Sequence, residues 1–171
     1  AAPDPAGRMG EYAIEVAKSL ERQLTKLYPR ASAATVRRAV GITPMIGINV
    51  GRKAGVLKDT GNNILANGEF VVHIADDTQL EAVHRSSIEY PPEVSEIAEL
   101  GLRTRPATHV RPPILVDAPV AMECRLHQSI AFGDTGSEFM VGTVLAFHFR
   151  AGLLENGKVD AERLRPICRL G

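Results

Sequence analysis

This chain of 171 residues has no tryptophan and only two cysteines, and its formal net charge is zero. Without a basic stripe or an acidic tail, the sequence lacks the charge pattern that a phosphate backbone selects, so we expect no nucleic-acid partner and a small ligand instead. Cys124 and Cys168 have neither zinc-site spacing nor a CxxC arrangement. We expect reduced thiols, although the sequence leaves a disulfide open.

Long apolar runs are also missing. No stretch approaches the length that crosses a bilayer, and the first ten residues, AAPDPAGRMG, lack the charged and apolar regions of a signal peptide. We therefore expect a cytoplasmic protein without a membrane segment. The length suits one domain with a well-buried core.

The first 41 residues predict a helical N-terminal segment. Between residues 9 and 28, apolar side chains recur at steps of three and four with polar residues between them, which is typical of an amphipathic helix, and Pro29 ends it. A shorter helix is expected from Ser32, a plausible N-cap, to Val40, before Gly41.

The character of the sequence changes after Pro44. Apolar runs rich in β-branched residues predict strands at residues 45–50 and 70–74. Between them we expect a helix that starts at Asp59 or Thr60, turns Ile64 and Leu65 inward and ends at Gly68. Further helices are expected from an Asp77 cap to residue 85 and around residues 94–100, after the extended turn at residues 90–92.

The C-terminal half is rich in strand patterns. Residues 118–130 and 138–149 predict two long strands joined by a turn at residues 132–136, so a long antiparallel hairpin is expected. The Asn156-Gly157 pair between apolar residues predicts a second hairpin. The sequence therefore indicates a mainly β fold with helices in its connections.

A candidate anion site lies between the first strand and the first helix of this region. The first amides of a helix are unpaired and the helix dipole favours negative charge there, so the start of the helix near Thr60 suits a phosphate. Lys58 adds a full charge, and Arg52 could reach the same anion with its planar fork. An alternative remains open: Asp59 or Thr60 merely caps the helix, and the basic residues form a solvated face.

An ordered series of segments resembles the flavin-reductase-like, FMN-binding split-barrel family. The stretch MIGINVGRKAGVLKDTGNNILANGEFVVHI is similar to the part of these proteins in which a strand leads to a Lys-Asp-Thr turn, a short helix and a Gly-Glu-Phe-Val-Val strand. Further similar segments are residues 82–87, 90–96, 110–113, 118–126, 139–144 and 159–171. The resemblance covers residues 42–171, and its strength lies in the order of the segments.

This resemblance implies an FMN-binding split β-barrel over residues 42–171, in one domain overall with the N-terminal helical segment 1–41. It implies a homodimer with flavin near the subunit interface. It also implies an oxidoreductase that passes electrons from NAD(P)H through FMN to flavin or another acceptor, and it leaves a monooxygenase partner open. Because the flavin itself accepts the hydride, no catalytic acid or base is needed.

The resemblance also assigns candidate residues to the cofactor. Lys58 and Thr60, with Asp59 in the same turn, would hold the FMN phosphate. Asn49, Gly51 and Arg52 would lie along the flavin. The alternative from a different class is a non-catalytic flavin-binding or interaction module.

Two other signals are weaker. The triplets Asp59-Thr60-Gly61 and Asp134-Thr135-Gly136 suggest an aspartic-type hydrolase, but a helix start and a turn account for both of them. The five histidines show no i, i+4 pair, so no metal site is expected. His73 and His148 lie in strand runs and are expected to be packed and hydrogen-bonded, whereas His84 could face a ligand.

Overall fold

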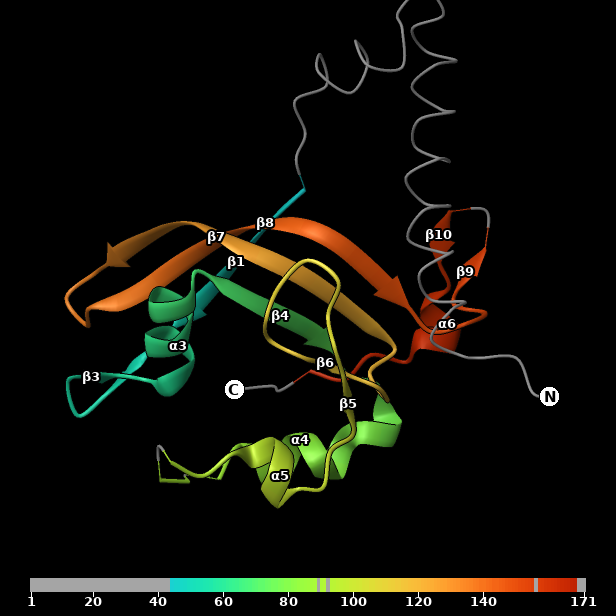
Figure 1. The fold of residues 1–171 in the computed structure, drawn as a ribbon, viewed down its shortest axis with the longest axis horizontal. Helices are drawn as coiled ribbons and strands as arrows, with labels where there is room; N and C mark the ends of the chain where they lie inside the picture. Colours follow the sequence, from blue (N-terminus) through green and yellow to red (C-terminus); the bar gives the residue numbers. More distant parts are fainter. Residues whose placement is uncertain (1–43, 89, 92, 156, 169–171) are drawn as a thin grey trace, which may run out of the picture.

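The computed structural model of the protein describes residues 44–88, 90–91, 93–155 and 157–168 (Figure 1). The helices predicted within residues 1–41 lie outside this part of the chain. The main sheet has four antiparallel strands in the order β1, β8, β7, β4, and their bounds are Met45–Val50, Ser137–Phe149, Val120–Phe132 and Glu69–Ile74. The strands predicted at residues 45–50, 70–74, 118–130 and 138–149 are thus confirmed to within two residues.

The long hairpin of β7 and β8 forms the centre of the fold. Its register shifts between Glu123 and Cys124 and again between Leu126 and Gln128. Such bulges bend a strand and increase its twist, and both strands arch across the molecule in Figure 1. The predicted turn at residues 132–136 is confirmed, because β7 ends at Phe132 and two glycines of the turn, Gly133 and Gly136, adopt positive φ.

Three two-stranded ribbons surround the sheet: β2 (Arg52–Lys53) with β3 (Val56–Leu57), β5 (Thr104–Arg105) with β6 (Ile114–Leu115), and β9 (Leu154–Glu155) with β10 (Lys158–Val159). The last ribbon confirms the hairpin predicted at Asn156-Gly157. In the first ribbon Ala54 and Gly55 both adopt positive φ, as the two central residues of a type I′ turn require.

Helices occupy the connections. Helix α3 (Asp59–Asn67) ends at Gly68, whose φ of 68° is left-handed, as predicted. Leu65, however, is 48% exposed, so the prediction that it points inward is wrong. Ile64, one position earlier on the helix, is buried in the core as predicted.

The remaining helices are short. The predicted helix after Asp77 divides into the 3₁₀ turn η1 (Asp77–Gln79) and helix α4 (Leu80–Ser86). Its cap is Asp76 rather than Asp77, because the Asp76 carboxylate accepts hydrogen bonds from the Thr78 backbone N–H and hydroxyl. The helix predicted around residues 94–100 is confirmed only as the single turn α5 (Glu96–Glu99), and α6 (Ala161–Leu164) follows β10.

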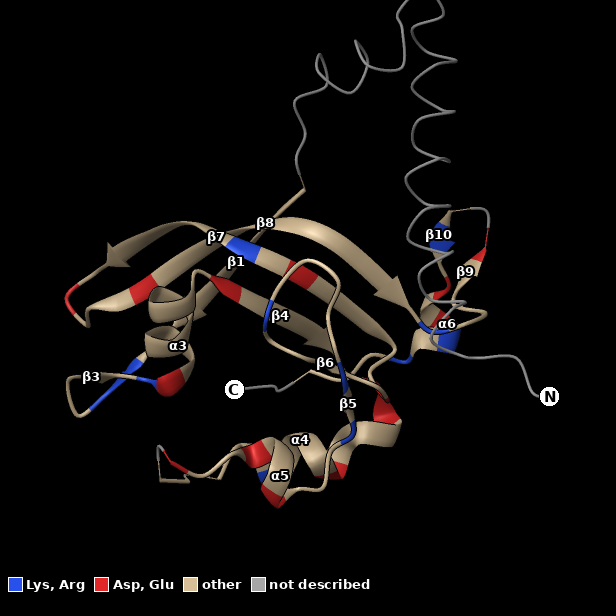
Figure 2. Ribbon diagram, viewed as in Figure 1, with Lys and Arg blue, Asp and Glu red and all other residues tan. Residues whose placement is uncertain are grey.

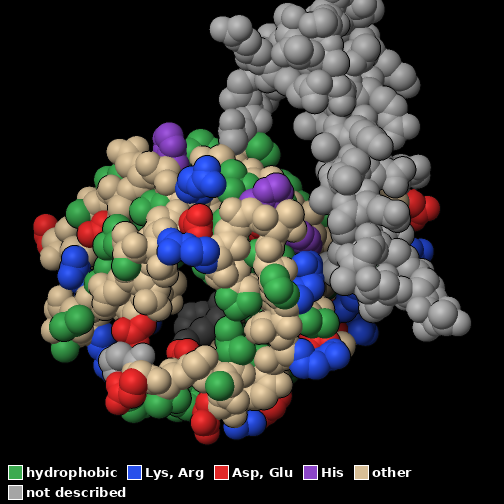
Figure 3. Space-filling model, viewed as in Figure 1, with side chains coloured by type: hydrophobic (Ala, Val, Ile, Leu, Met, Phe, Trp, Pro, Cys, Tyr) green, Lys and Arg blue, Asp and Glu red, His purple; other side chains and the backbone are tan. Residues whose placement is uncertain are grey.

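Charged residues are sparse on the main sheet (Figure 2). Its four strands carry only Glu69, Glu123, Arg125 and Glu138. The three glutamates each contact a basic side chain: Arg111, His148 and Arg52 respectively. Arg111 and Arg52 lie outside the main sheet, so their pairs attach a loop and the β2–β3 ribbon to it. The pair of Glu123 and His148 joins the neighbouring strands β7 and β8 within the sheet. On the face seen in Figure 3, the surface is hollowed between α3 and the segment that carries α5.

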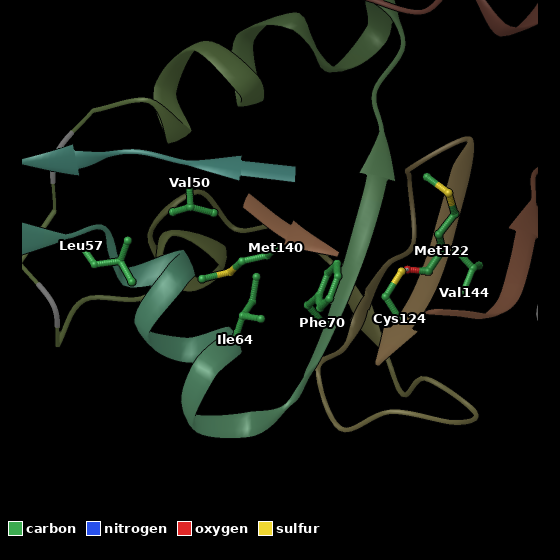
Figure 4. Close-up of a cluster of buried hydrophobic side chains, with 8 residues drawn as sticks. All are labelled: Val50, Leu57, Ile64, Phe70, Met122, Cys124, Met140 and Val144. Carbon is green, nitrogen blue, oxygen red and sulfur yellow. The ribbon is translucent and has the colours of Figure 1, made fainter. Parts of the chain in front are cut away.

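The core lies between one face of the sheet and α3 (Figure 4). It consists of Val50, Leu57, Ile64, Phe70, Met122, Cys124, Met140 and Val144. Gly142 on β8 is needed here, because a Cβ at this position would lie 2.4 Å from Cζ of Phe70. This packing fixes the start of α3 beside the ends of β1 and β3, where the candidate anion site was predicted.

Candidate functional site

The candidate site begins at the N-terminus of α3. The N-cap residue is Lys58, and its side chain makes no capping hydrogen bond. Within the described part of the chain, no acceptor bonds to the backbone N–H groups of Asp59 and Thr60. Lys58, Asp59 and Thr60 are all exposed. The alternative that Asp59 or Thr60 is the N-cap is therefore wrong, and the helix presents free N–H groups beside a lysine.

The ribbon in front of this helix supports the same turn. The Lys58 N–H donates to the Gly51 carbonyl at 3.4 Å, which closes the β2–β3 ribbon onto the end of β1. The Asn62 side chain donates to the Leu57 carbonyl at 3.0 Å and fixes the first turn from the other side. Basic residues of the ribbon and of the helix start lie next to each other in Figure 2.

Arg52 is directed toward the β7–β8 hairpin. Its Nε donates to the Gly136 carbonyl at 2.6 Å, and Nη1 donates to the Gly55 carbonyl at 3.2 Å. Its Nη2 lies 3.6 Å from Oε1 of Glu138. With these contacts the guanidinium braces the ribbon against the hairpin turn, so Arg52 supports the loop in front of α3.

A cavity of about 700 Å³ runs along one face of α3. From α3 it is lined by Thr60, Asn63, Ile64 and Asn67, and from the sheet by Ile48 and β4. The opposite wall consists of Ile97, Arg111, Pro112, Pro113 and Leu115. Most of this lining is apolar, and the volume is in the range of small-molecule and cofactor sites.

Thr60 joins the two features, since it belongs to the first turn of α3 and also lines the cavity. The remaining predicted residues are placed differently. Asn49 is exposed and follows Ile48 on β1. Because neighbouring residues of a strand point to opposite faces and Ile48 lines the cavity, the Asn49 side chain projects from the other face of the sheet. Gly51 is next to Lys58 through its carbonyl. The structure thus brings Gly51, Lys58, Asp59 and Thr60 together and separates Asn49 from them.

Sequence reasoning missed the polar residues of the cavity. Asn63 and Asn67 follow Thr60 at steps of three and four, a spacing that places all three on one helix face, so this signal was present. Glu69 accepts hydrogen bonds from the backbone N–H and Nε of Arg111, both at 3.0 Å. No local pattern could have paired two residues so distant in the chain.

The other candidate chemistries have less support. Asp59 and Asp134 are both exposed, and no hydrogen bond joins them in the described part of the chain, so they do not form a carboxylate pair that shares a proton. His73 and His148 are packed and hydrogen-bonded, as predicted. Both cysteines are free, Cys124 buried and Cys168 exposed. Among the described residues there is no cluster suited to a metal ion and no helix long and apolar enough to span a membrane.

Comparison with known proteins identifies the family. The model of the flavin reductase like domain matches residues 29–164. The chain belongs to this family. The match to this flavin reductase-like domain begins 13 residues before the region in which the sequence segments resembled it, within the segment predicted to be helical.

Individual relatives and solved structures support the same family and fold. An uncharacterized protein of Halalkalibacterium halodurans is 35% identical to this chain, over 98% of the chain and 87% of the relative. Nitrilotriacetate monooxygenase component B from Bacillus cereus is 35% identical, with a TM-score of 0.69 over 72% of this chain and 63% of that one. A structure from Shewanella frigidimarina with a split-barrel domain, 17% identical with a TM-score of 0.63 over 72% of this chain and 61% of that one, shares the fold.

The fold is therefore a mainly β split barrel, as expected from the sequence. The chain spans less than two thirds of the length of the two solved structures named above.

Proposed function

We propose that this flavin reductase-like domain binds FMN, with the phosphate at the N-terminus of α3 and the ring system in the adjoining cavity. The observation that carries the proposal is the position of Thr60, which is shared by the free helix N-terminus and the cavity wall. FMN has a dianionic end and a flat, largely apolar end, and these two features suit the two parts of the site. The family to which the chain belongs supports the same ligand.

The individual residues would act as follows. The N–H groups of Asp59 and Thr60, the Thr60 hydroxyl and the Lys58 ammonium would donate to the phosphate. Gly51 would keep the loop close to the helix start, and Arg52 would hold that loop against the β7–β8 hairpin. Asn49, on the other sheet face, would contact the flavin only at a subunit interface, in keeping with the homodimer that we expect.

When bound, FMN would supply the hydride and electron transfer chemistry. We propose that the domain is an oxidoreductase that passes electrons from NAD(P)H to flavin or to another acceptor. The family supports this activity, and similarity to a monooxygenase component supports a monooxygenase as one partner. The alternative is a flavin-binding module without turnover. Reduction of bound flavin by NADH or NADPH separates the two, because only the enzyme bleaches the flavin absorbance.

The phosphate site is tested by substitution. Lys58→Ala and Thr60→Ala should each weaken FMN binding by about 1 to 3 kcal/mol, as expected for loss of a charge-assisted hydrogen bond. Lys158→Ala, which removes an exposed lysine from the distant β10, is the matched control and should leave the affinity unchanged. Unchanged affinity in both site variants would refute the assignment.

A further inference from the structure

A buried polar network lies behind the outer wall of the cavity. Glu123 on β7 is completely buried, and its carboxylate faces the loop between β5 and β6. Its Oε1 accepts the Thr108 backbone N–H at 2.9 Å, and its Oε2 accepts the His109 N–H at 2.6 Å. A buried carboxylate is tolerated only when such donors replace water. Glu123 therefore fixes the loop two residues before the cavity-lining segment that begins at Arg111.

His148 on β8 completes the network. Its Nε2 lies 2.6 Å from Oε1 of Glu123, and its Nδ1 lies 3.2 Å from Nη2 of Arg105. Arginine nitrogens only donate, so Nδ1 of His148 is the acceptor. Nε2 therefore carries the proton and donates a hydrogen bond to the Glu123 carboxylate. This assignment makes His148 a neutral bridge between the Arg105 cation at the start of the loop and the Glu123 anion.

The ionisation behaviour agrees with this geometry. Burial alone would raise the pKa of Glu123, but the hydrogen bonds from Thr108, His109 and His148 outweigh it and lower that pKa. Burial lowers the pKa of His148, and the Arg105 charge adds to this effect against the opposing influence of Glu123. The carboxylate is thus charged and the imidazole neutral at pH 7.

The far end of the loop is held by the same sheet. Nε2 of His73 on β4 accepts the Leu115 N–H at 3.0 Å. The loop from Arg105 to Leu115 is therefore fastened at both ends by side chains of three neighbouring strands. Between these attachments lies the cavity wall, which includes two consecutive prolines with restricted backbones.

We propose that Glu123 and His148 are positioning residues that set the affinity of the cavity for the flavin ring by holding its outer wall. This inference rests on the proposed FMN site. Neither residue lines the cavity, so both act through the loop. In Glu123→Gln, the amide offers one acceptor oxygen and one donor group, so at least one of the two loop N–H groups loses its acceptor.

The test compares FMN with riboflavin, which has the ring but no phosphate, by titration of flavin fluorescence at a temperature well below thermal unfolding. Glu123→Gln should raise the Kd of both ligands by about tenfold, because the loop that forms the outer wall loses a hydrogen bond to a charged group. At saturation the visible band of its bound flavin should shift toward that of free flavin, because a loosened wall admits water. Lys58→Ala should raise the Kd for FMN alone.

Glu155→Gln, an exposed glutamate on β9, is the matched control and should bind both ligands like the wild type. If Glu123→Gln does not fold, His148 provides the comparison. His148→Gln, which keeps a donor for Glu123, should retain most of the affinity, and His148→Ala should lose it. Wild-type affinity for both flavins in a folded Glu123→Gln or His148→Ala protein overturns this inference. A wild-type protein that binds neither flavin overturns the proposed function and this inference with it.

Discussion

Acidification should destabilise this protein through His73. The ring accepts the Leu115 N–H through Nε2, which only a neutral imidazole can do. Burial lowers the pKa of His73 from 6.5 to about 4, and the neighbouring Arg105 and His148 add to the effect. In the unfolded chain the pKa returns to about 6.5. Because the unfolded state then binds the proton more readily, stability is retained above pH 6.5 and is lost as the pH falls from 6.5 toward 4.

The size of the effect follows from these two pKa values. With the full difference between the folded and the unfolded pKa of His73, the free energy of unfolding is about 2 kcal/mol lower at pH 5 than at pH 7. Because the ring is only partly shielded from water, we expect about 1 to 2 kcal/mol. The assay is urea-induced unfolding at pH 7 and pH 5.

The comparison uses two substitutions. His73→Gln keeps an acceptor for the Leu115 N–H but cannot take up a proton in this range, so its loss between pH 7 and pH 5 should be smaller than that of the wild type by about 1 to 2 kcal/mol. His127→Gln, which replaces an exposed histidine of β7, should behave like the wild type. An equal loss in the wild type and in His73→Gln would refute the reasoning.

Two further predictions concern the packing of the core and the reactivity of the two cysteines. Gly142→Ala should destabilise the protein by about 1 to 3 kcal/mol in urea unfolding, because the new methyl group meets the Phe70 ring; unchanged stability would show that the ring has room to move. Cys168 is exposed and should react quickly with a chromogenic disulfide reagent, whereas Cys124 is buried with a pKa raised to about 11 and should react only on unfolding. Fast reaction of two thiols in the native protein would contradict this.

Local signals in the sequence predicted the elements of the fold well. Two long strand patterns joined by the turn at residues 132–136 predicted the β7–β8 hairpin, and Gly68 predicted the end of α3. Errors arose where neighbours compete. Asp76 and Asp77 are both suitable caps, and the hydrogen bonds from Thr78 select the first. Leu65 is as apolar as Ile64, but only the side of α3 that carries Ile64 packs against the core.

Only the local part of the candidate site could be predicted from the sequence. The helix start at Lys58 to Thr60 is a local feature and could be located from sequence. The cavity is not local: its outer wall depends on contacts such as that between Glu123 and the Thr108 N–H, which form only when distant segments meet. A glutamate inside the apolar run at the start of β7 was the one available sign of such a contact.

The central claim is that the site at α3 binds FMN. The most direct test is the visible absorption spectrum of the purified protein after incubation with FMN and removal of free cofactor. The account predicts that the protein retains a flavin spectrum and that Lys58→Ala retains much less. A wild-type protein that stays colourless at saturating FMN would contradict the claim.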